Sequence, residues 1–243
     1  MKIFYSLFLI LTFNFLFAQL EKNIDHQSLF WSRYYNQLSI NSQWSIHTEF
    51  DSRIFLNPLE ENQYVFRIQG RYKVNKNIEI GAGFSYFSVA TQNPEITYPY
   101  RIPEYRGQQD ITWKQEYCNF TLNQRFQIEE RFIQNSNKEE LLPNSTFFWR
   151  FRYRLQGEYL FSKKQSSFLK LIVYDELMIN AGENIVYNTF DQNRIYGAMQ
   201  YGFNKNISLE LGYLKSFQQR ASGLNYYNRD IIRFTLYHKI FLN

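Results

Sequence analysis

The sequence predicts an all-β protein folded as a single up-and-down antiparallel β-barrel that crosses a membrane. Three observations lead to this prediction: a signal-like N-terminus, polar and apolar residues that alternate with period two, and connections that are alternately short and long. The 243-residue chain is 20% aromatic, with 24 Phe and 20 Tyr, yet its mean hydropathy is −0.48. A barrel reconciles these values, because only every second residue of its strands meets lipid and aromatic residues gather at both interfaces.

The first segment of the chain resembles an export signal. Lys2 precedes an apolar run from Ile3 to Phe17, and Ala18 provides a small residue before a polar stretch. The run is shorter than the roughly 20 residues that a membrane helix needs. We therefore expect three parts: a cleaved signal peptide (1–18), an N-terminal leader segment (19–28) and the barrel (29–243).

Composition excludes several classes of function. Lysine and arginine number 27 against 22 acidic residues, and this small, scattered excess does not predict nucleic-acid binding. Cys118 is the only cysteine, so no intramolecular disulfide is possible. One cysteine and three dispersed histidines predict no metal site, and no motif predicts a cofactor.

Alternation is clearest in "FFWRFRYRLQGEYLF" (147–161), where Trp149 and Phe151 share one face and Arg150 and Arg152 share the other. A soluble sheet would bury the apolar face and leave the arginines in water, whereas a membrane barrel turns the apolar face to lipid and the charges into its lumen. Strands of soluble β-sandwiches are usually about five or six residues long, and these segments are longer. We therefore expect the membrane barrel, with a soluble periplasmic β protein as the alternative.

Segments with this alternation begin near residues 29, 43, 64, 78, 105, 120, 147, 168, 193, 207 and 230. Short and long connections alternate between them, and two of the short ones, "VNKN" and "FNKN", stand in hairpins that form a weak internal repeat. Short turns on the periplasmic rim and long loops outside are typical of outer-membrane barrels. Because bacterial single-chain barrels have an even number of strands, we expect about twelve, with ten as the alternative.

Several segments resemble a known family. They are "YDELMIN", with Asp175 and Glu176, "FDQNRIYGAMQYGF", with Asn193 and Arg194, and "NKNISLELGYL"; weaker features are Trp31 and "RFQIEERF". The resemblance is to the uncharacterised barrel family called domain of unknown function 2490, and it covers nearly the whole chain after the signal peptide. It implies a small outer-membrane β-barrel. It carries over no catalytic residue, because the family has no known activity.

Parity also predicts which charges face the lumen. The expected network is Arg67, Arg71, Arg125, Glu129, Arg150, Arg152, Arg154, Glu158, Glu176, Arg194 and Arg233, with Glu49, Asp51, Glu79 and Glu210 as further possible partners. Glu176 and Arg194 have matching parity across one hairpin, so we expect them to form a cross-strand pair. Either these charges interlock and plug a narrow lumen, or the surplus arginines line a path that prefers anions.

Catalytic residues are not predicted. His26-Gln27-Ser28 has the spacing of a His-x-Ser pair, but nothing near it fixes the geometry. His47 lies on the same face as Glu49, and we expect a hydrogen-bonded lumen histidine there and not a general base.

The expected protein is a small barrel of a Gram-negative outer membrane, with an arginine-rich polar lumen and a structural or binding role. A narrow channel for small anionic solutes is the alternative, and an enzyme that modifies lipid or lipopolysaccharide is the third candidate. Expected partners are outer-membrane lipids and the barrel-assembly machinery, and the expected state is a monomer.

Overall fold

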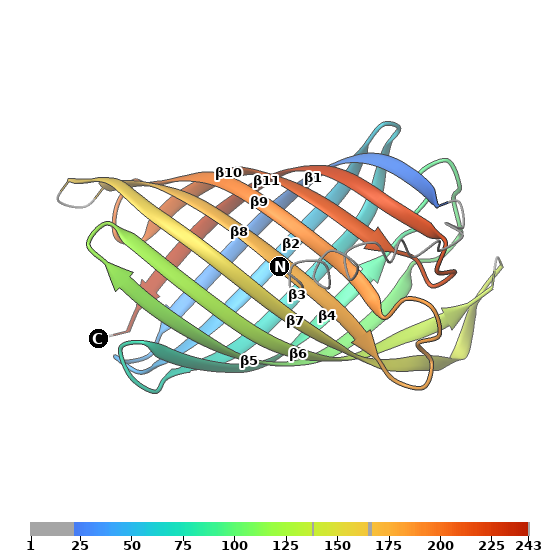
Figure 1. Ribbon diagram of the computed structural model, residues 1–243, viewed down its shortest axis with the longest axis horizontal. Coiled ribbons are helices and arrows are strands. Elements are labelled where there is room, and N and C mark those ends of the chain that lie inside the picture. The colour runs from blue at the N-terminus through green and yellow to red at the C-terminus, as the bar shows by residue number, and fades with distance from the viewer. Residues whose placement is uncertain (1–21, 138, 165–166, 243) are drawn as a thin grey trace, which may run out of the picture.

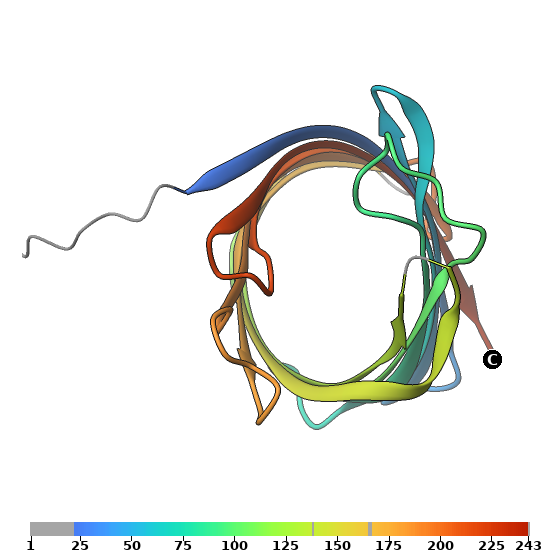
Figure 2. The same ribbon diagram turned by 90° about the vertical axis from the view of Figure 1, so that its right-hand side faces the viewer.

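The computed structural model describes residues 22–137, 139–164 and 167–242. Within these ranges the chain forms eleven strands: β1 (Asn23–Ser39), β2 (Trp44–Leu56), β3 (Leu59–Lys73), β4 (Ile78–Val89), β5 (Ile102–Tyr117), β6 (Phe120–Ser136), β7 (Leu141–Lys164), β8 (Ser167–Ala181), β9 (Phe190–Gly202), β10 (Ile207–Gln219) and β11 (Asn225–Phe241). Neighbouring strands are hydrogen bonded into one closed barrel (Figure 1), which appears as a ring when viewed from its end (Figure 2). The described residues contain no helix that is both long and apolar enough to span a membrane.

The barrel closes between β1 and β11, which run parallel, while the other neighbouring pairs are antiparallel. The all-β barrel is confirmed, and eleven strands lie close to the expected twelve. The expectation of antiparallel pairing throughout is corrected at this one seam, because an odd number of strands brings the first and last strands together in the same direction. Residues 23–28, expected as part of a leader segment, belong to β1. The signal-peptide prediction falls on residues 1–18, outside the described residues.

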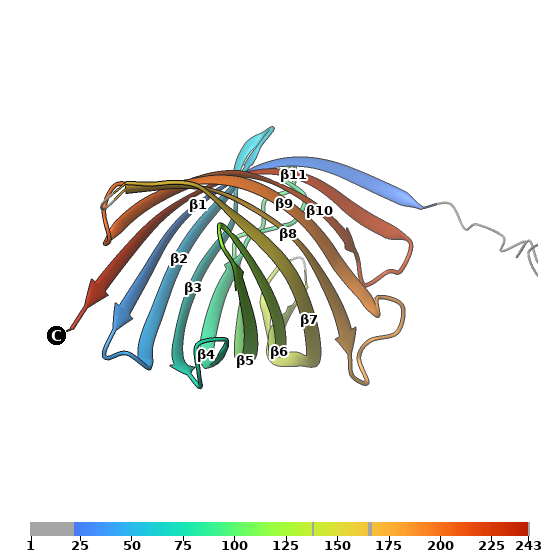
Figure 3. The ribbon, with the colours of Figure 1, turned by 60° about the vertical axis from the view of Figure 1, so that its left-hand side comes forward.

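The connections define two ends of the barrel, between which the strands are tilted (Figure 3). The turn end carries the connections 40–43, 74–77, 118–119 and 203–206, and the loop end carries 57–58, 90–101, 182–189 and 220–224. The segment "LNPLEEN" (56–62), expected from the sequence as a long loop, is instead a two-residue connection, since β2 and β3 continue to pair as far as Leu56 and Leu59. The strand β1 begins at the loop end, and β11 finishes at the turn end.

Asparagine shapes the repeated short turns. The Oδ1 atom of Asn75 accepts hydrogen bonds from the backbone N–H groups two and three residues later, at 2.8 and 2.9 Å. Asn204 does the same at 2.8 and 2.8 Å, and Asn41 at 2.9 and 2.7 Å. A side chain of this kind mimics a backbone turn. The internal repeat in the sequence therefore corresponds to one turn structure, which is also formed at Asn41.

Alternation sorts the side chains between the two faces of the barrel wall. Apolar side chains cover the exterior; Phe126, near the middle of β6, is 55% exposed. Polar side chains on this face form hydrogen bonds with each other. Asn193 Nδ2 donates to Asp175 Oδ1 at 2.6 Å, and Lys215 Nζ donates to Asp230 Oδ1 at 2.8 Å. The exterior thus combines an apolar surface with internally satisfied polar groups.

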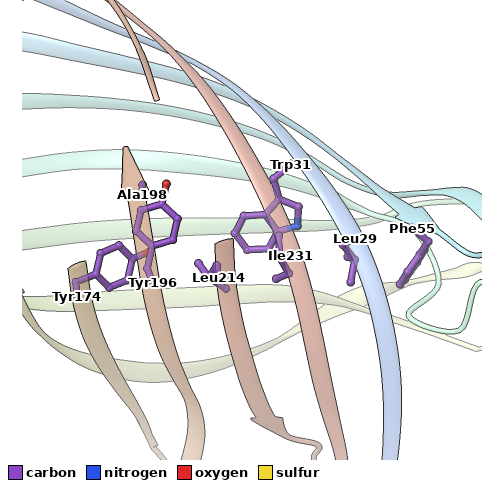
Figure 4. Close-up of a cluster of buried hydrophobic side chains, with 8 residues drawn as sticks. All are labelled: Leu29, Trp31, Phe55, Tyr174, Tyr196, Ala198, Leu214 and Ile231. Carbon is purple, nitrogen blue, oxygen red and sulfur yellow. The ribbon is translucent and has the colours of Figure 1, made fainter. Parts of the chain in front are cut away.

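A cluster of apolar and aromatic side chains lies inside the barrel, from its middle toward the loop end (Figure 4). Its members are Leu29, Trp31, Phe55, Tyr174, Tyr196, Ala198, Leu214 and Ile231, which come from β1, β2, β8, β9, β10 and β11. Burying their apolar surface stabilises the fold by roughly 25 cal/mol for each Å² removed from water. This part of the interior is therefore packed like a core.

Candidate functional site

The barrel interior contains a buried charge plug toward the loop end and a cavity that reaches the turn end. The eleven interior charges expected from the sequence are divided between the two. Nine of them line the cavity: Arg67, Arg71, Arg125, Arg152, Arg154, Glu158, Glu176, Arg194 and Arg233. Glu129 and Arg150 belong to the plug.

We define the charge plug as Glu104, Arg106, Glu129, Arg131, Arg150 and Asp191, none of which is more than 8% exposed. Glu129 accepts hydrogen bonds from Arg150 Nε at 2.9 Å and from Arg106 Nη1 at 3.3 Å. Glu104 Oε1 lies 2.6 Å from the Nε atoms of both Arg106 and Arg131, and Asp191 Oδ2 lies 3.0 Å from Arg150 Nη1. Buried charges are tolerated when they are paired, and here three arginines hold three carboxylates.

Apolar side chains close the interior beside the charge plug. Leu29, Leu214, Ile231 and Met178 are each 0% exposed. A side chain that bordered a water-filled channel would be partly accessible to water. The interior is therefore dry at this level of the barrel.

The loop 90–101 is attached to the barrel at the loop end through Gln92. The backbone carbonyl of Gln92 accepts a hydrogen bond from Gln27 Nε2 at 2.8 Å, and its side-chain oxygen accepts one from Arg229 Nη2 at 2.8 Å. Gln27 lies on β1 and Arg229 on β11. These contacts fasten the loop to the seam where the barrel closes.

The cavity has a volume of about 430 Å³ and reaches the turn end at Asn204, Lys205 and Asn206. Twelve lysines and arginines line it, against six aspartates and glutamates. Low-dielectric walls strengthen the field of charges of one sign and concentrate counter-ions in such a space. The cavity is therefore suited to anions.

A row of charged side chains crosses four strands at the inner end of the cavity. Arg125 on β6 stands opposite Arg154 on β7, Arg154 stands opposite Glu176 on β8, and Glu176 stands opposite Arg194 on β9. The expected register of Glu176 and Arg194 is thus present. The hydrogen bonds of Glu176 go elsewhere, however, to Arg125 Nη2 at 2.6 Å and to Arg152 Nη2 at 2.8 Å. Glu176 and Arg194 therefore face each other as expected, while the hydrogen bonds that Glu176 accepts come from Arg125 and Arg152.

Other cations around the cavity are paired with carboxylates. Arg71 Nη2 lies 2.9 Å from Asp110 Oδ1, and Arg233 Nη2 lies 3.0 Å from Glu210 Oε1. Further pairs are Arg53–Asp51, Arg67–Glu49 and Lys170–Glu158. These cations are neutralised locally, so the cationic surplus is concentrated elsewhere in the lining.

The interior charges that the reasoning from sequence missed include Arg33, Glu104, Arg106, Asp110 and Asp191. Three of them stand at every second position of "EYRGQQD" and could have been found by the parity rule. The intervening face of that segment includes Gly107 and Gln109, which are not apolar enough to reveal the alternation.

The histidine candidates do not form an open catalytic arrangement. His47 contacts the Tyr35 hydroxyl through Nδ1, and its Nε2 lies 3.0 Å from Ser45 Oγ, so both ring nitrogens have partners. His26 and Ser28 are exposed on β1, and within the described ranges no hydrogen bond joins them. In the same part of the chain no group of three His, Cys, Asp or Glu side chains is placed to hold a metal ion.

Comparison with known proteins places the chain in a family. Residues 29–228 match the model of the family described as "Protein of unknown function (DUF2490)", and the chain belongs to this family. No curated protein and no solved structure gives a significant match. The family assignment agrees with the resemblance seen in the sequence and adds no activity to it.

Proposed function

We propose that this member of the DUF2490 family is an outer-membrane barrel with a closed lumen, whose basic cavity binds small anionic solutes that enter through the turn end. The observation that carries the proposal is the one-sided interior: a cavity with a cationic surplus lies on one side of a buried, paired and dry plug. Conduction requires a continuous path past every constriction. An interior of this kind retains a solute and does not pass it on.

The exterior supports a place in the membrane. Large apolar side chains are exposed on strands all around the barrel, among them Phe50, Phe66, Phe126, Val173 and Leu211. Soluble monomers rarely expose so much contiguous apolar surface, whereas a membrane barrel needs it. The signal-like segment at 1–18 agrees with export.

Orientation follows from the two ends of the barrel. In outer-membrane barrels the short turns face the periplasm and the long loops face outside. The mouth of the cavity would then open to the periplasm, and the charge plug would separate it from the exterior. We further propose that the barrel-assembly machinery inserts the chain as a monomer, with lipids around its apolar face.

A narrow anion channel is the second candidate, because twelve basic residues against six acidic ones in the lining would favour anions in transit. Water would then have to pass Leu29, Leu214 and Ile231, which are fully buried. We therefore favour binding over conduction.

Lipid vesicles loaded with a fluorophore that iodide quenches test both parts of the proposal. The mature protein is refolded into them, and insertion is scored by the gel mobility shift between unheated and boiled samples. We expect an inserted barrel through which iodide enters no faster than in empty vesicles. A protein that remains in solution would contradict the membrane location, and quenching in proportion to inserted protein would contradict the closed lumen.

A further inference from the structure

Buried hydrogen-bond donors without partners gather at the inner end of the cavity. Eight buried side-chain nitrogen or oxygen atoms have no hydrogen-bond partner within the described part of the chain, and four of them are the Nε atoms of Arg125, Arg152, Arg154 and Arg194. All four side chains line the cavity. An unsatisfied buried donor destabilises the fold unless a ligand or an ordered water bonds to it. The cluster therefore marks a place where an acceptor belongs.

These four arginines face too few carboxylates. Glu176 accepts hydrogen bonds from Arg125 Nη2 at 2.6 Å and from Arg152 Nη2 at 2.8 Å. Arg154 and Arg194 flank Glu176 on the two neighbouring strands, yet neither forms an ion pair or a hydrogen bond with any residue that the structure describes. Two guanidinium charges are thus left uncompensated beside a carboxylate that is already engaged.

Aromatic rings hold the two uncompensated arginines in place. The guanidinium of Arg154 lies 5.5 Å from the ring centroid of Tyr174, and that of Arg194 lies 5.4 Å from the ring centroid of Trp31. Contacts of this kind attract a guanidinium to the ring and leave its N–H edges free to donate. Both guanidinium groups are therefore held near the cavity without using their N–H groups.

We propose that Arg154 and Arg194, supported by Arg125, bind a dianionic phosphate group at the inner end of the cavity. Two uncompensated positive charges match the two negative charges of a phosphate. A phosphate also offers enough oxygens for three guanidinium groups, whereas a carboxylate has only two. The inference rests on the proposed binding function and names the class of solute that the same cavity takes.

The mouth of the cavity suits the entry of such a ligand. Lys205 and Lys239 lie at the turn end among the lining residues, so basic residues extend from the mouth to the inner arginines. Charges of one sign along a cleft raise the local concentration of a counter-ion and speed its association. A cavity of about 430 Å³ has room for the phosphate and a small organic substituent.

Titration calorimetry of the refolded, full-length mature barrel with inorganic phosphate is the test. We expect saturable binding to the wild type and binding about tenfold weaker or worse in Arg154→Gln and in Arg194→Gln, since each removes a charge-assisted contact. Arg101→Gln is the matched control, because Arg101 pairs with Glu61 at the loop end and lies outside the cavity. The mobility shift on heating shows whether each variant has folded.

A second measurement covers the case in which a variant does not fold. Glycerol phosphate is titrated into the wild type at pH values above and below its second pKa of about 6. Arginine stays charged throughout, so a site for a dianion binds more tightly above that pKa. Equal affinity at both pH values, or phosphate binding that survives both arginine substitutions, would overturn the proposal.

The source of the phosphate is resolved by comparing two ligands. Short-chain phosphatidic acid stands for a lipid headgroup, and inorganic phosphate for a free solute; the tighter ligand identifies the source. A closed barrel that binds neither would overturn this inference and leave the proposed lumen closure intact. A barrel that conducts, with a current that is blocked by phosphate, would overturn the closure and leave the phosphate site intact.

Discussion

Replacing Glu129 with glutamine removes the carboxylate at the centre of the charge plug. Glu129 is 1% exposed and accepts hydrogen bonds from Arg106, Arg150 and Arg152 and from Gln127. Glutamine keeps one acceptor oxygen but replaces the other with an NH₂ group that faces guanidinium donors. The substitution therefore loses hydrogen bonds and leaves one positive charge unpaired in the interior.

The expected cost follows from the burial of this site. Removing one partner of a buried ion pair destabilises a protein by about 3–5 kcal/mol, because the remaining charge is neither paired nor hydrated. Glu129 lies between three arginines, so we expect the change to fall at the upper part of that range. Water in an open pore would hydrate the remaining charges and reduce the loss to about 1 kcal/mol or less.

Equilibrium unfolding in urea, with the barrel refolded into lipid vesicles, measures this loss of free energy. Glu130→Gln is the matched control, since Glu130 is the next residue, points to the exterior and accepts hydrogen bonds from Gln109 Nε2 at 3.2 Å. We expect it to change the free energy of unfolding by less than about 1 kcal/mol. Similar small losses in both variants would refute the dry, closed interior.

Three further predictions address the membrane, the orientation and the core. Phe126→Arg, at an exposed position on the middle of β6, should lower the free energy of unfolding in a bilayer by about 2–4 kcal/mol, whereas Val186→Arg in an exposed loop should leave it nearly unchanged; equal tolerance would argue against a lipid-facing exterior. Cys118, exposed at the turn end, should react with an impermeant maleimide only after the outer membrane is permeabilised, and labelling of intact cells would reverse the orientation. Leu214→Ala should destabilise the barrel by about 2–5 kcal/mol, because it leaves a cavity at a fully buried site. The exterior control Leu211→Ala should destabilise it less in the same urea titration. A larger loss in Leu211→Ala would contradict a packed core inside the barrel.

The alternation of side chains predicted most of the fold. Each of the eleven segments recognised in the sequence is a strand, and the parity of Trp149 and Arg150 places them on the exterior and interior as expected. The strand number was raised to about twelve by a rule on even-numbered barrels. The parallel seam between β1 and β11 depends on contacts between the two ends of the chain, and no local pattern encodes it.

The interior site was harder to predict than the wall. Parity showed which arginines point inward, but it does not fix their partners, because a long side chain reaches past the residue directly opposite. Arg125 bonds to Glu176 two strands away, although Arg154 stands between them in register. The division of the interior into plug and cavity depends on such diagonal contacts and on the fully buried Leu29 and Ile231, and the sequence contains no signal for it.

Single-channel recording in a planar bilayer tests the closed lumen most directly. The refolded mature barrel is inserted under a salt gradient, and the heat-dependent mobility shift of the same preparation establishes that it is folded. The charge plug and the buried side chains beside it predict a silent protein. A steady current with an anion-selective reversal potential would contradict the closure and show that the cavity continues through the barrel.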